Sequence, residues 1–305
     1  MEIVKPLAQY LAALALAPLL PGVINRVKAF FAGRRGQPVL QLYYDLYKLS
    51  RKTPVYSRTA TWVFRAGPAA SLAALLAALL VLPFAGRSAP FSFDGDFVLL
   101  IYLLGLARFA TVLAALDTGS AFEGMGASRE MQFAVFAEPA FFLGLTALAR
   151  AGGHASLAGM FGALTPGIWR VAAPVLALLT ASFFIVLLAE NSRVPADDPN
   201  THLELTMIHE VMVLDHSGPD LACILYGAAL KLWLFASLIA CVVLPRRTGS
   251  WATDSALFLL AVLGTAAAVG VVESVMARLR LLKVPYMLIT AFAFSALALI
   301  FQMSR

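Results

Sequence analysis

The stretch FVLLIYLLGLARFATVLAAL, residues 97–116, decides the class of fold. It contains a single charged side chain, Arg108, and about 20 apolar residues are what an α-helix needs to cross a bilayer. The rest of the chain has the same character: 61% of its 305 residues are hydrophobic, 13% are charged, and the mean hydropathy is +0.83. A soluble domain carries about a quarter charged residues. The composition therefore excludes a soluble protein, and continuous apolar runs favour membrane helices over the alternating strands of a barrel.

Seven further apolar runs resemble this one. The eight runs are residues 6–24, 67–84, 97–116, 133–148, 171–189, 221–244, 256–272 and 284–301. They are rich in small residues, which let helices approach closely inside a membrane. The first run lacks the basic start of a signal peptide, so we interpret it as a retained helix. We find no internal repeat and expect one all-α integral membrane domain over residues 1–305, with about eight transmembrane helices in one bundle.

The distribution of charge predicts the orientation. With eight spans, the loops after the first, third, fifth and seventh spans lie on one side, and they hold most of the basic residues. The positive-inside rule places these odd-numbered loops in the cytoplasm and both termini outside. Most of the acidic residues lie on the same side. This concentration of polar groups on one face predicts a docked partner there.

The first odd-numbered loop, residues 26–65, contains an amphipathic pattern. One helical face is apolar, comprising Val39, Leu42, Tyr43, Leu46 and Leu49, and the other is polar, comprising Gln41, Asp45, Lys48 and Lys52. We expect an amphipathic helix at the membrane interface, with its tyrosines at headgroup depth. Two roles stay open for it: anchoring to the membrane, or a platform for a soluble partner.

Ionisable residues also occur inside the predicted spans. Arg108 and Asp117 belong to the third span, Glu138 precedes Pro139 in the fourth, and Lys231 lies deep in the sixth. A charge at the bilayer centre costs about 2.5–3.5 kcal/mol on insertion scales, so each needs a partner or a wet cavity. Glu138 is either a proton-relay group or a structural partner of Arg108 or Lys231. Lys231 is either functional or part of a buried ion pair.

The loop ENSRVPADDPNTHLELTMIHEVMVLDHSGPD, residues 190–220, is the richest in titratable groups. Thr201 and Glu204 form the pattern of a capping box, which predicts a helix start. His202, Glu204, His209 and Glu210 follow one another at a spacing that matches no common zinc signature, so we expect no metal site. A cluster of carboxylates and imidazoles that holds or passes protons fits better. The two cysteines, Cys223 and Cys241, form no CxxC pair, so we expect no iron–sulfur cluster in this chain.

Several of these runs together resemble a known family. They are DTGSAFEGMGASRE (117–130), AEP (137–139), ENSRVPADDPNTHLELTMIHE (190–210) and GRRG (33–36). They are similar to the membrane subunit of group 4 [NiFe] hydrogenases, of the formate hydrogenlyase and hydrogenase-4 type, which is related to subunit 1 of respiratory complex I. The resemblance covers essentially the whole chain. It departs from the complex I members at Gln37, where an R-x-G-P element is interrupted, and at Pro195–Pro199, which replaces a Pro-Phe-Asp pattern.

The resemblance implies a subunit of a larger complex in the inner (plasma) membrane of a prokaryote. Its partners would be hydrogenase-like large and small subunits, an iron–sulfur protein and antiporter-like membrane subunits, with the [NiFe] centre and the iron–sulfur clusters in those partners and no cofactor in this chain. The candidates for a proton path or cavity are Arg108, Asp117, Glu123, Glu130, Glu138, Glu190, Asp197, Asp198, Glu204, His209, Glu210, Lys231 and Glu273. The candidates for docking a partner are Arg34, Arg35, Gln41, Asp45, Lys48, Arg278, Arg280 and Lys283.

Two other functions stay open. The first is the quinone-site subunit of a complex I-like NADH- or ferredoxin:quinone oxidoreductase. The second is a stand-alone ion-coupled transporter, although such proteins often show inverted repeats with binding residues at the midplane, and here the acids lie on one face. Nucleic acid is not an expected partner, because the basic residues flank the membrane and alternate with acids.

Overall fold

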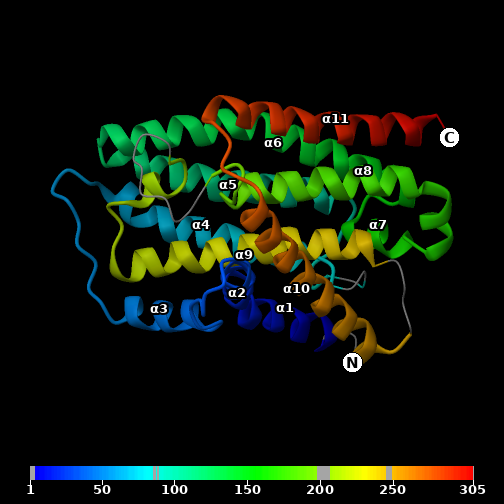
Figure 1. Cartoon of the computed structure of the whole chain (residues 1–305), viewed down its shortest axis with the longest axis horizontal. Coiled ribbons are helices and arrows are strands. Elements are labelled where there is room, and N and C mark those ends of the chain that lie inside the picture. Colours follow the sequence, from blue (N-terminus) through cyan, green and yellow to red (C-terminus); the bar gives the residue numbers. More distant parts are fainter. Residues whose placement is uncertain (1–3, 85–86, 88, 198–206, 245–248, 305) are drawn as a thin grey trace.

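The computed structural model describes residues 4–84, 87, 89–197, 207–244 and 249–304. Within this part the chain forms an elongated bundle of α-helices (Figure 1). The helices are α1 Val4–Leu16, α2 Leu19–Phe31, α3 Gln41–Ser50, α4 Trp62–Val81, α5 Asp96–Asp117, α6 Ala121–Gly152, α7 Leu157–Ala163, α8 Pro166–Glu190, α9 Gly218–Val243, α10 Trp251–Val275 and α11 Val284–Met303. Two 3₁₀ turns, η1 Glu210–Val213 and η2 Leu281–Lys283, precede α9 and α11.

The predicted all-α membrane bundle is confirmed. Seven of the described helices are long and apolar enough to cross a bilayer, or eight spans if the bent pair α1–α2 counts as one. The amphipathic helix predicted in the first loop is α3, which packs against α9 with Tyr44 and Tyr47 exposed. The chain is therefore a multi-pass membrane protein.

The first span differs from the continuous helix expected over residues 6–24. α1 and α2 meet at an angle of 46°, and Pro18 lies at the break because its ring blocks the helix and it has no N–H to donate. The carbonyl groups freed there find partners on other helices. The hydroxyl of Tyr226 on α9 donates to the Leu14 oxygen at 2.9 Å, and that of Tyr43 on α3 donates to the Ala15 oxygen at 2.5 Å.

The fourth span is longer than the predicted run of residues 133–148. α6 starts at Ala121 and continues for 32 residues, because its polar first turns extend the helix beyond the apolar stretch. Glycine makes this extension pack closely: Gly126 lies against the loop segment of Ile208 and Val211. The short helix α7, which no apolar run predicted, begins with Ser156 accepting a hydrogen bond from the Gly159 N–H.

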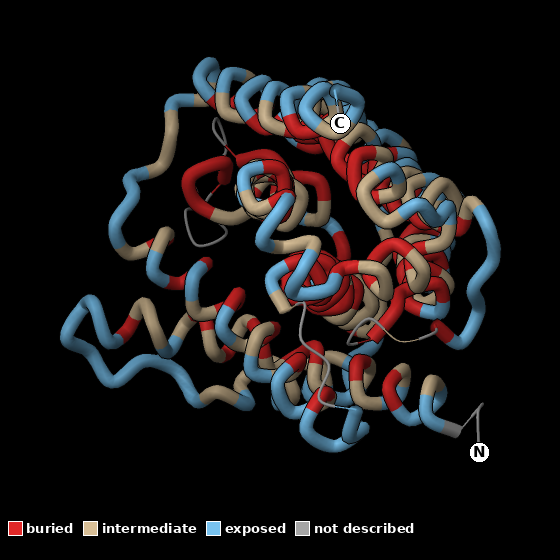
Figure 2. The backbone as a smooth tube through the Cα atoms, turned by 90° about the vertical axis from the view of Figure 1, so that its right-hand side faces the viewer, coloured by how far each residue is buried: buried red, intermediate tan, exposed pale blue. Residues whose placement is uncertain are grey.

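The core lies around α9. In this helix 78% of the most apolar stretch is buried, against 28% for α10 and for the last span, and its Trp233 and Phe235 are among the largest fully buried side chains. Figure 2 shows the buried residues turned toward the interior of the bundle and the exposed ones outward. α10 and α11 therefore present wide apolar faces to the outside, as expected of helices in contact with lipid or with other membrane subunits.

The two ends of the bundle differ. One end carries the long connection 32–61, the segments 191–197 and 207–217, and the α5–α6 turn, and we call it the long-loop end (Figure 1). Toward the opposite end α1 begins and α11 finishes. That end is tied by an ion pair of 2.8 Å between Arg87 and Asp254, and by the buried Asp96, which accepts the Leu157 N–H at 2.6 Å. Which side of the membrane the long-loop end faces stays a prediction.

Candidate functional site: a buried charged network

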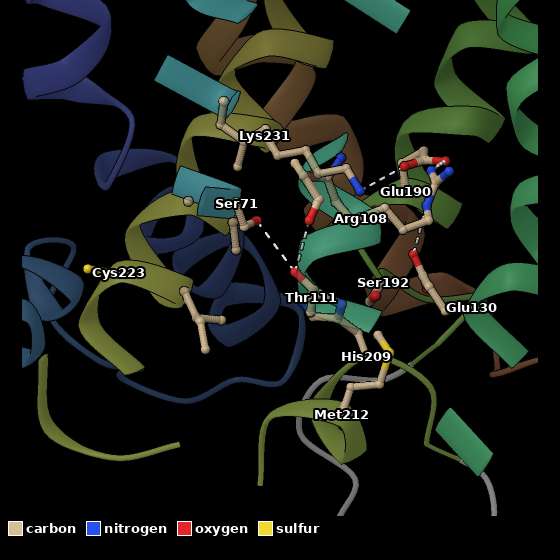
Figure 3. A pocket seen from close by; sticks show the side chains of 16 residues that line it. Ser71, Arg108, Thr111, Glu130, Glu190, Ser192, His209, Met212, Cys223 and Lys231 are labelled. Atoms are coloured by element: carbon tan, nitrogen blue, oxygen red, sulfur yellow. Dashed lines mark hydrogen bonds and ion pairs between the residues drawn. The ribbon is translucent and has the colours of Figure 1, made fainter. Parts of the chain in front are cut away.

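Arg108 is the centre of a charged network inside the bundle. Its side chain is 5% exposed and its three guanidinium nitrogens approach three carboxylates. The Nε atom lies 3.3 Å from Glu130 on α6, and the two terminal nitrogens contact Glu138 on α6 and Glu190 on α8. Figure 3 shows Arg108 between Glu190 and Glu130. The predicted pair of Arg108 with Glu138 is therefore one contact of a larger group.

Lys231 extends this network to a fourth helix. Its ammonium nitrogen on α9 lies 2.7 Å from the second oxygen of Glu190. Glu190 therefore bridges both buried cations. With all five groups ionised, three carboxylates face two cations, and the network carries one excess negative charge. We call Arg108, Glu130, Glu138, Glu190 and Lys231 the central network.

The members of the central network differ in exposure. The side chains of Arg108, Glu190 and Glu130 are 5%, 7% and 13% exposed, whereas that of Glu138 is 45% exposed. Glu130 and Glu138 lie eight residues apart, a little over two turns, and so project from one side of α6. The network thus runs from the interior of the bundle to its surface at Glu138, where nothing in the described chain covers the carboxylate fully.

A cavity of about 70 Å³ adjoins the network. Arg108, Glu130, Glu190 and Lys231 line it together with hydroxyl groups, which come from Ser71 on α4 and Thr111 on α5. A buried water needs about 10–15 Å³ of such space and two to four polar partners. The cavity therefore has room and partners for several waters, which could link groups that do not touch directly.

His209 lines the cavity and belongs to a loop segment of the long-loop end. The segment that carries it is held by Asp197, whose carboxylate accepts the backbone N–H groups of Ile208 at 3.1 Å and His209 at 3.4 Å. Asp197 is itself 2.6 Å from Arg278 in the α10–α11 connection. Burial lowers the pKa of the His209 imidazole, against the opposing pull of Glu130. The imidazole is therefore neutral at neutral pH and can accept a proton if negative charge is added nearby.

A second ion cluster lies beside the first. The fully buried carboxylate of Glu273 on α10 is 2.8 Å from Lys28 on α2 and 3.6 Å from Arg193 just after α8. Three chain segments far apart in sequence are thereby joined at the long-loop end. Glu273, a predicted path residue, belongs to this cluster and forms no ion pair with the central network within the described residues.

Other predicted path residues have local structural contacts. Asp117 accepts the N–H groups of Thr61 at 2.7 Å and Phe64 at 3.2 Å, so it caps the start of α4. Glu123 is buried and accepts the Asp215 N–H at 3.2 Å. Glu210 is half-buried at the start of η1. Asp198 and Glu204, with the capping box at Thr201 and with His202, lie outside the described residues.

The predicted docking residues share one end but not one role. Gln41 donates to Asp45 at 2.9 Å within α3. Arg34 and Arg35 line an open pocket after α2. Five of the eight are exposed: Arg34, Arg35, Lys48, Arg280 and Lys283. Arg278 instead forms the ion pair with Asp197 described above, which holds the loop of His209.

Sequence reasoning did not single out several residues of the site. Ser71 and Thr111 line the cavity with hydroxyl groups 3.4 Å apart. The imidazole of His216 stacks on Phe64, with ring centroids 4.0 Å apart and planes 4° from parallel. Single Ser and Thr residues inside apolar helices have no sequence signal, whereas His216 next to Asp215 could have been noted. No group of three or more His, Cys, Asp or Glu residues in the described ranges is placed to hold a metal ion.

The fold and the network define a class: a multi-pass membrane protein whose interior holds paired ionisable side chains beside a polar cavity. The particular family follows from comparison. A family model described as NADH dehydrogenase matches residues 5–304, and the chain belongs to this family, of the complex I subunit 1 type. The resemblance inferred from the sequence motifs is confirmed.

Two relatives cover nearly the full length. Hydrogenase-4 component C of Escherichia coli (strain K12) is 32% identical over 308 residues, which are 99% of this chain and 96% of the relative. Formate hydrogenlyase subunit 4 of the same organism is 31% identical over 306 residues, 98% of each chain. A chain of the membrane-bound sulfane sulfur reductase, an archaeal respiratory membrane complex, has the same fold, with a TM-score of 0.83 over 99% of this chain and 100% of that chain at 19% identity.

Proposed function

We propose that this chain is the membrane-anchor and coupling subunit of a multi-subunit hydrogenase of the formate hydrogenlyase or hydrogenase-4 type. It docks a soluble electron-transfer arm at the long-loop end and links redox chemistry in that arm to proton translocation. The observation that carries the proposal is the central network, in which one arginine and one lysine share three carboxylates beside a polar cavity. Relatives that cover the whole chain support the choice of complex.

The charge of the network suits a proton carrier. Its single excess negative charge, inside a low-dielectric bundle, favours binding of one proton from the cavity. Arg108 divides its attraction among three carboxylates, so no one of them is fully neutralised by it. A proton can then be transferred between carboxylates, or through cavity water, without any of them having to leave the network.

The coupling we propose is electrostatic. Electrons that arrive in the arm add negative charge near the 190–210 loop. This charge raises the proton affinity of the neutral His209, of its sequence neighbour Glu210, and of Glu204 in the same loop sequence. His209 lines the same cavity as Glu130 and Glu190, so a proton taken up there has a short way into the central network. The exit is Glu138, the exposed member, from which an antiporter-like membrane subunit would receive the proton.

The partners follow from this arrangement. Hydrogenase-like large and small subunits and an iron–sulfur protein would carry the [NiFe] centre and the iron–sulfur clusters, while this chain supplies ionisable groups and contacts. The exposed docking candidates are Arg34, Arg35, Lys48, Arg280 and Lys283, and Gln41 and Asp45 belong to the same helix as Lys48. By itself the cavity of about 70 Å³ is far below the roughly 300–1,000 Å³ of a drug-sized ligand site, which favours water over quinone inside this chain.

Copurification tests the proposal. The chain is tagged at its C-terminus, the complex is purified in mild detergent, and copurifying proteins are identified together with their nickel and iron content. We expect a hydrogenase-like large subunit with nickel. The same arm without nickel would favour the quinone- or ferredoxin-linked oxidoreductase. A chain that purifies alone and exchanges ions in proteoliposomes would contradict both and support a transporter.

Charge reversal then locates the docking face. The variant Arg280→Glu/Lys283→Glu changes two exposed cations in the α10–α11 connection, which contacts the long-loop end at Pro195 and Asp197. The variant Arg150→Glu/Arg170→Glu changes two exposed cations in the helices on either side of α7, toward the opposite end (Figure 1). We expect the first variant to lose the soluble subunits and the second to keep them. Equal retention in both would place the docking surface elsewhere.

A further inference from the structure

Three arginines cluster around the end of α2: Arg26 lies in the helix, and Arg34 and Arg35 follow it. The helix ends in a tight turn, in which Gly33 adopts a positive φ of 63°, the Gly33 N–H donates to the Phe30 oxygen at 3.1 Å and the Arg34 N–H donates to the Ala29 oxygen at 2.9 Å. This is the Schellman pattern, which turns the chain back along the helix. Arg34 and Arg35 thereby line one pocket of about 360 Å³ with Arg26, Val27 and Phe30.

The charge of this pocket is uncompensated within the described chain. No described carboxylate lies within ion-pair distance of Arg26, Arg34 or Arg35, whereas the neighbouring Lys28 is paired with Glu273. The lining consists of three guanidinium groups and two apolar side chains, with no acid among them. Such a pocket attracts an anion, and the planar guanidinium fork suits the oxygens of a phosphate group.

The position of the pocket indicates whether this phosphate belongs to a lipid or to a soluble anion. The last turns of α2 pack on the last turns of α10: a Cβ at Gly270 would meet Val27, and Glu273 pairs with Lys28. α10 ends at Val275, and the chain re-enters the bundle at Val284. The pocket therefore lies where several apolar spans end, at the depth of lipid headgroups.

Exposed apolar side chains in the pocket wall and near the start of α11 support a lipid. Phe30 in the pocket wall is 82% exposed and its neighbour Phe31 is 52% exposed, while Leu282 and Tyr286 near the start of α11 are 84% and 70% exposed. Large apolar groups in water are costly, whereas aromatic side chains beside basic ones are typical of the membrane interface. A soluble anion would use the arginines and leave these side chains without a partner.

We infer that Arg26, Arg34 and Arg35 bind the phosphate of an anionic phospholipid, with Phe30 against its acyl chains. This goes beyond the proposed function and does not depend on it, because a lipid can occupy the pocket whichever soluble arm the complex carries. It gives Arg34 and Arg35 a partner other than a docked protein. The bound lipid would lie at the end of α2, next to its contact with the end of α10.

Lipid retention tests the inference. The intact complex is purified in mild detergent, supplied with equal amounts of phosphatidylglycerol and phosphatidylcholine, and analysed by native mass spectrometry. Arg34→Gln/Arg35→Gln removes two pocket charges, and Lys52→Gln/Arg58→Gln removes two exposed charges of the same loop outside the pocket. We expect the pocket variant to lose one retained phosphatidylglycerol per chain, with affinity lower by about thirtyfold for two basic residues, and the control to keep it.

Two further measurements make the result unambiguous. Arg34→Lys/Arg35→Lys keeps the charge and should retain the lipid, so a loss there together with poor assembly would point to misfolding and overturn the phosphate role. Inorganic phosphate at millimolar concentration should not displace the lipid, and displacement would assign the pocket to a free anion. Equal lipid counts in pocket variant and control, with soluble subunits lost from the pocket variant, would assign the arginines to protein docking instead.

Discussion

Glu190 is the residue on which the central network depends most, because it alone touches both buried cations. Removing one partner of a buried pair leaves a charge without compensation, which is far costlier than losing a pair at the surface. Glu138 contacts only Arg108 and its side chain is nearly half exposed. Two carboxylates on the same arginine should therefore respond very differently to neutralisation.

We expect Glu190→Gln to lower the free energy of unfolding by about 3–5 kcal/mol, since Lys231 loses its ionised partner inside the bundle. Glu138→Gln should cost about 1 kcal/mol or less. Thermal unfolding of the purified complex, followed for this subunit, measures both. Equal losses for the two variants would show that the network is not organised around Glu190.

His216 should make stability depend on pH. Its imidazole is buried against Phe64, and burial lowers its pKa from the ordinary value of 6.5. Below pH about 6.5 the unfolded chain binds a proton that the folded chain does not, so stability is full above this pH and falls as the pH decreases. His209, whose pKa is lowered by the same cause, acts in the same direction.

The variant His216→Phe keeps the ring stack and removes the titration. We expect its melting temperature to fall less than that of the wild type between pH 7.5 and 5.5. His154→Phe changes an exposed histidine at the opposite end and serves as the control, with an unchanged slope. An unchanged slope for His216→Phe would contradict the buried, neutral state of this imidazole.

Among the elements, the broken first span depends on hydroxyl groups from two other helices. The hydroxyl of Tyr226 satisfies a carbonyl that Pro18 leaves free. Tyr226→Phe should cost about 1–3 kcal/mol, the penalty of a buried acceptor without a donor. Tyr102→Phe, on an exposed tyrosine of α5, should be neutral. Thermal unfolding compares the two, and similar losses would show that the break is stabilised otherwise.

The contact of α6 with the loop segment that carries His209 requires a residue without a side chain at Gly126. A Cβ at Gly126 would lie 2.3 Å from Val211 and 2.8 Å from the Ile208 oxygen. A Cβ at Gly124 would have no atom within 4 Å. We expect Gly126→Ala to push the loop away, at a cost of about 1–3 kcal/mol, and to reduce coupled proton movement. Gly124→Ala should do neither. Equal activity in both would show that the position of His209 does not matter.

Composition and apolar runs were enough to predict the class of fold, because a bilayer imposes one length and one polarity on every span. They could not place the ends of α6, whose first turns are polar and are stabilised by packing against the loop of Val211. They also missed the break at Pro18, since a proline alone does not tell whether neighbouring helices will satisfy the freed carbonyl groups.

The buried charges of the site could be predicted, but their pairing could not. A buried charge must have a partner, so Arg108, Glu138 and Lys231 could be singled out from their places in apolar runs. Which carboxylate meets which cation depends on how four helices pack, and the pairing of Lys231 with Glu190 on another helix has no trace in the sequence. Asp117 looked similar to Glu138 in sequence, yet it caps α4.

At the scale of the whole molecule, the ionisable groups form an asymmetric arrangement. The Glu273 cluster and the His209 loop lie at the long-loop end, the central network lies inside the bundle, and Glu138 reaches its surface. This order gives a direction to proton transfer: uptake under the docked arm, storage in the network, and release through Glu138 to a neighbouring subunit. The broad apolar faces of α10 and α11 leave room for lipid and for other membrane subunits.

The central claim is that protons pass through the network and leave by Glu138, and one measurement tests it most directly. Complexes carrying Glu138→Gln, or Asp94→Asn as a control carboxylate exposed at the opposite end, are reconstituted in proteoliposomes, and redox-driven proton translocation is recorded with a pH-sensitive dye. The account predicts that Glu138→Gln assembles and catalyses electron transfer but translocates few protons, while Asp94→Asn behaves as the wild type. Full translocation by an assembled Glu138→Gln complex would contradict it.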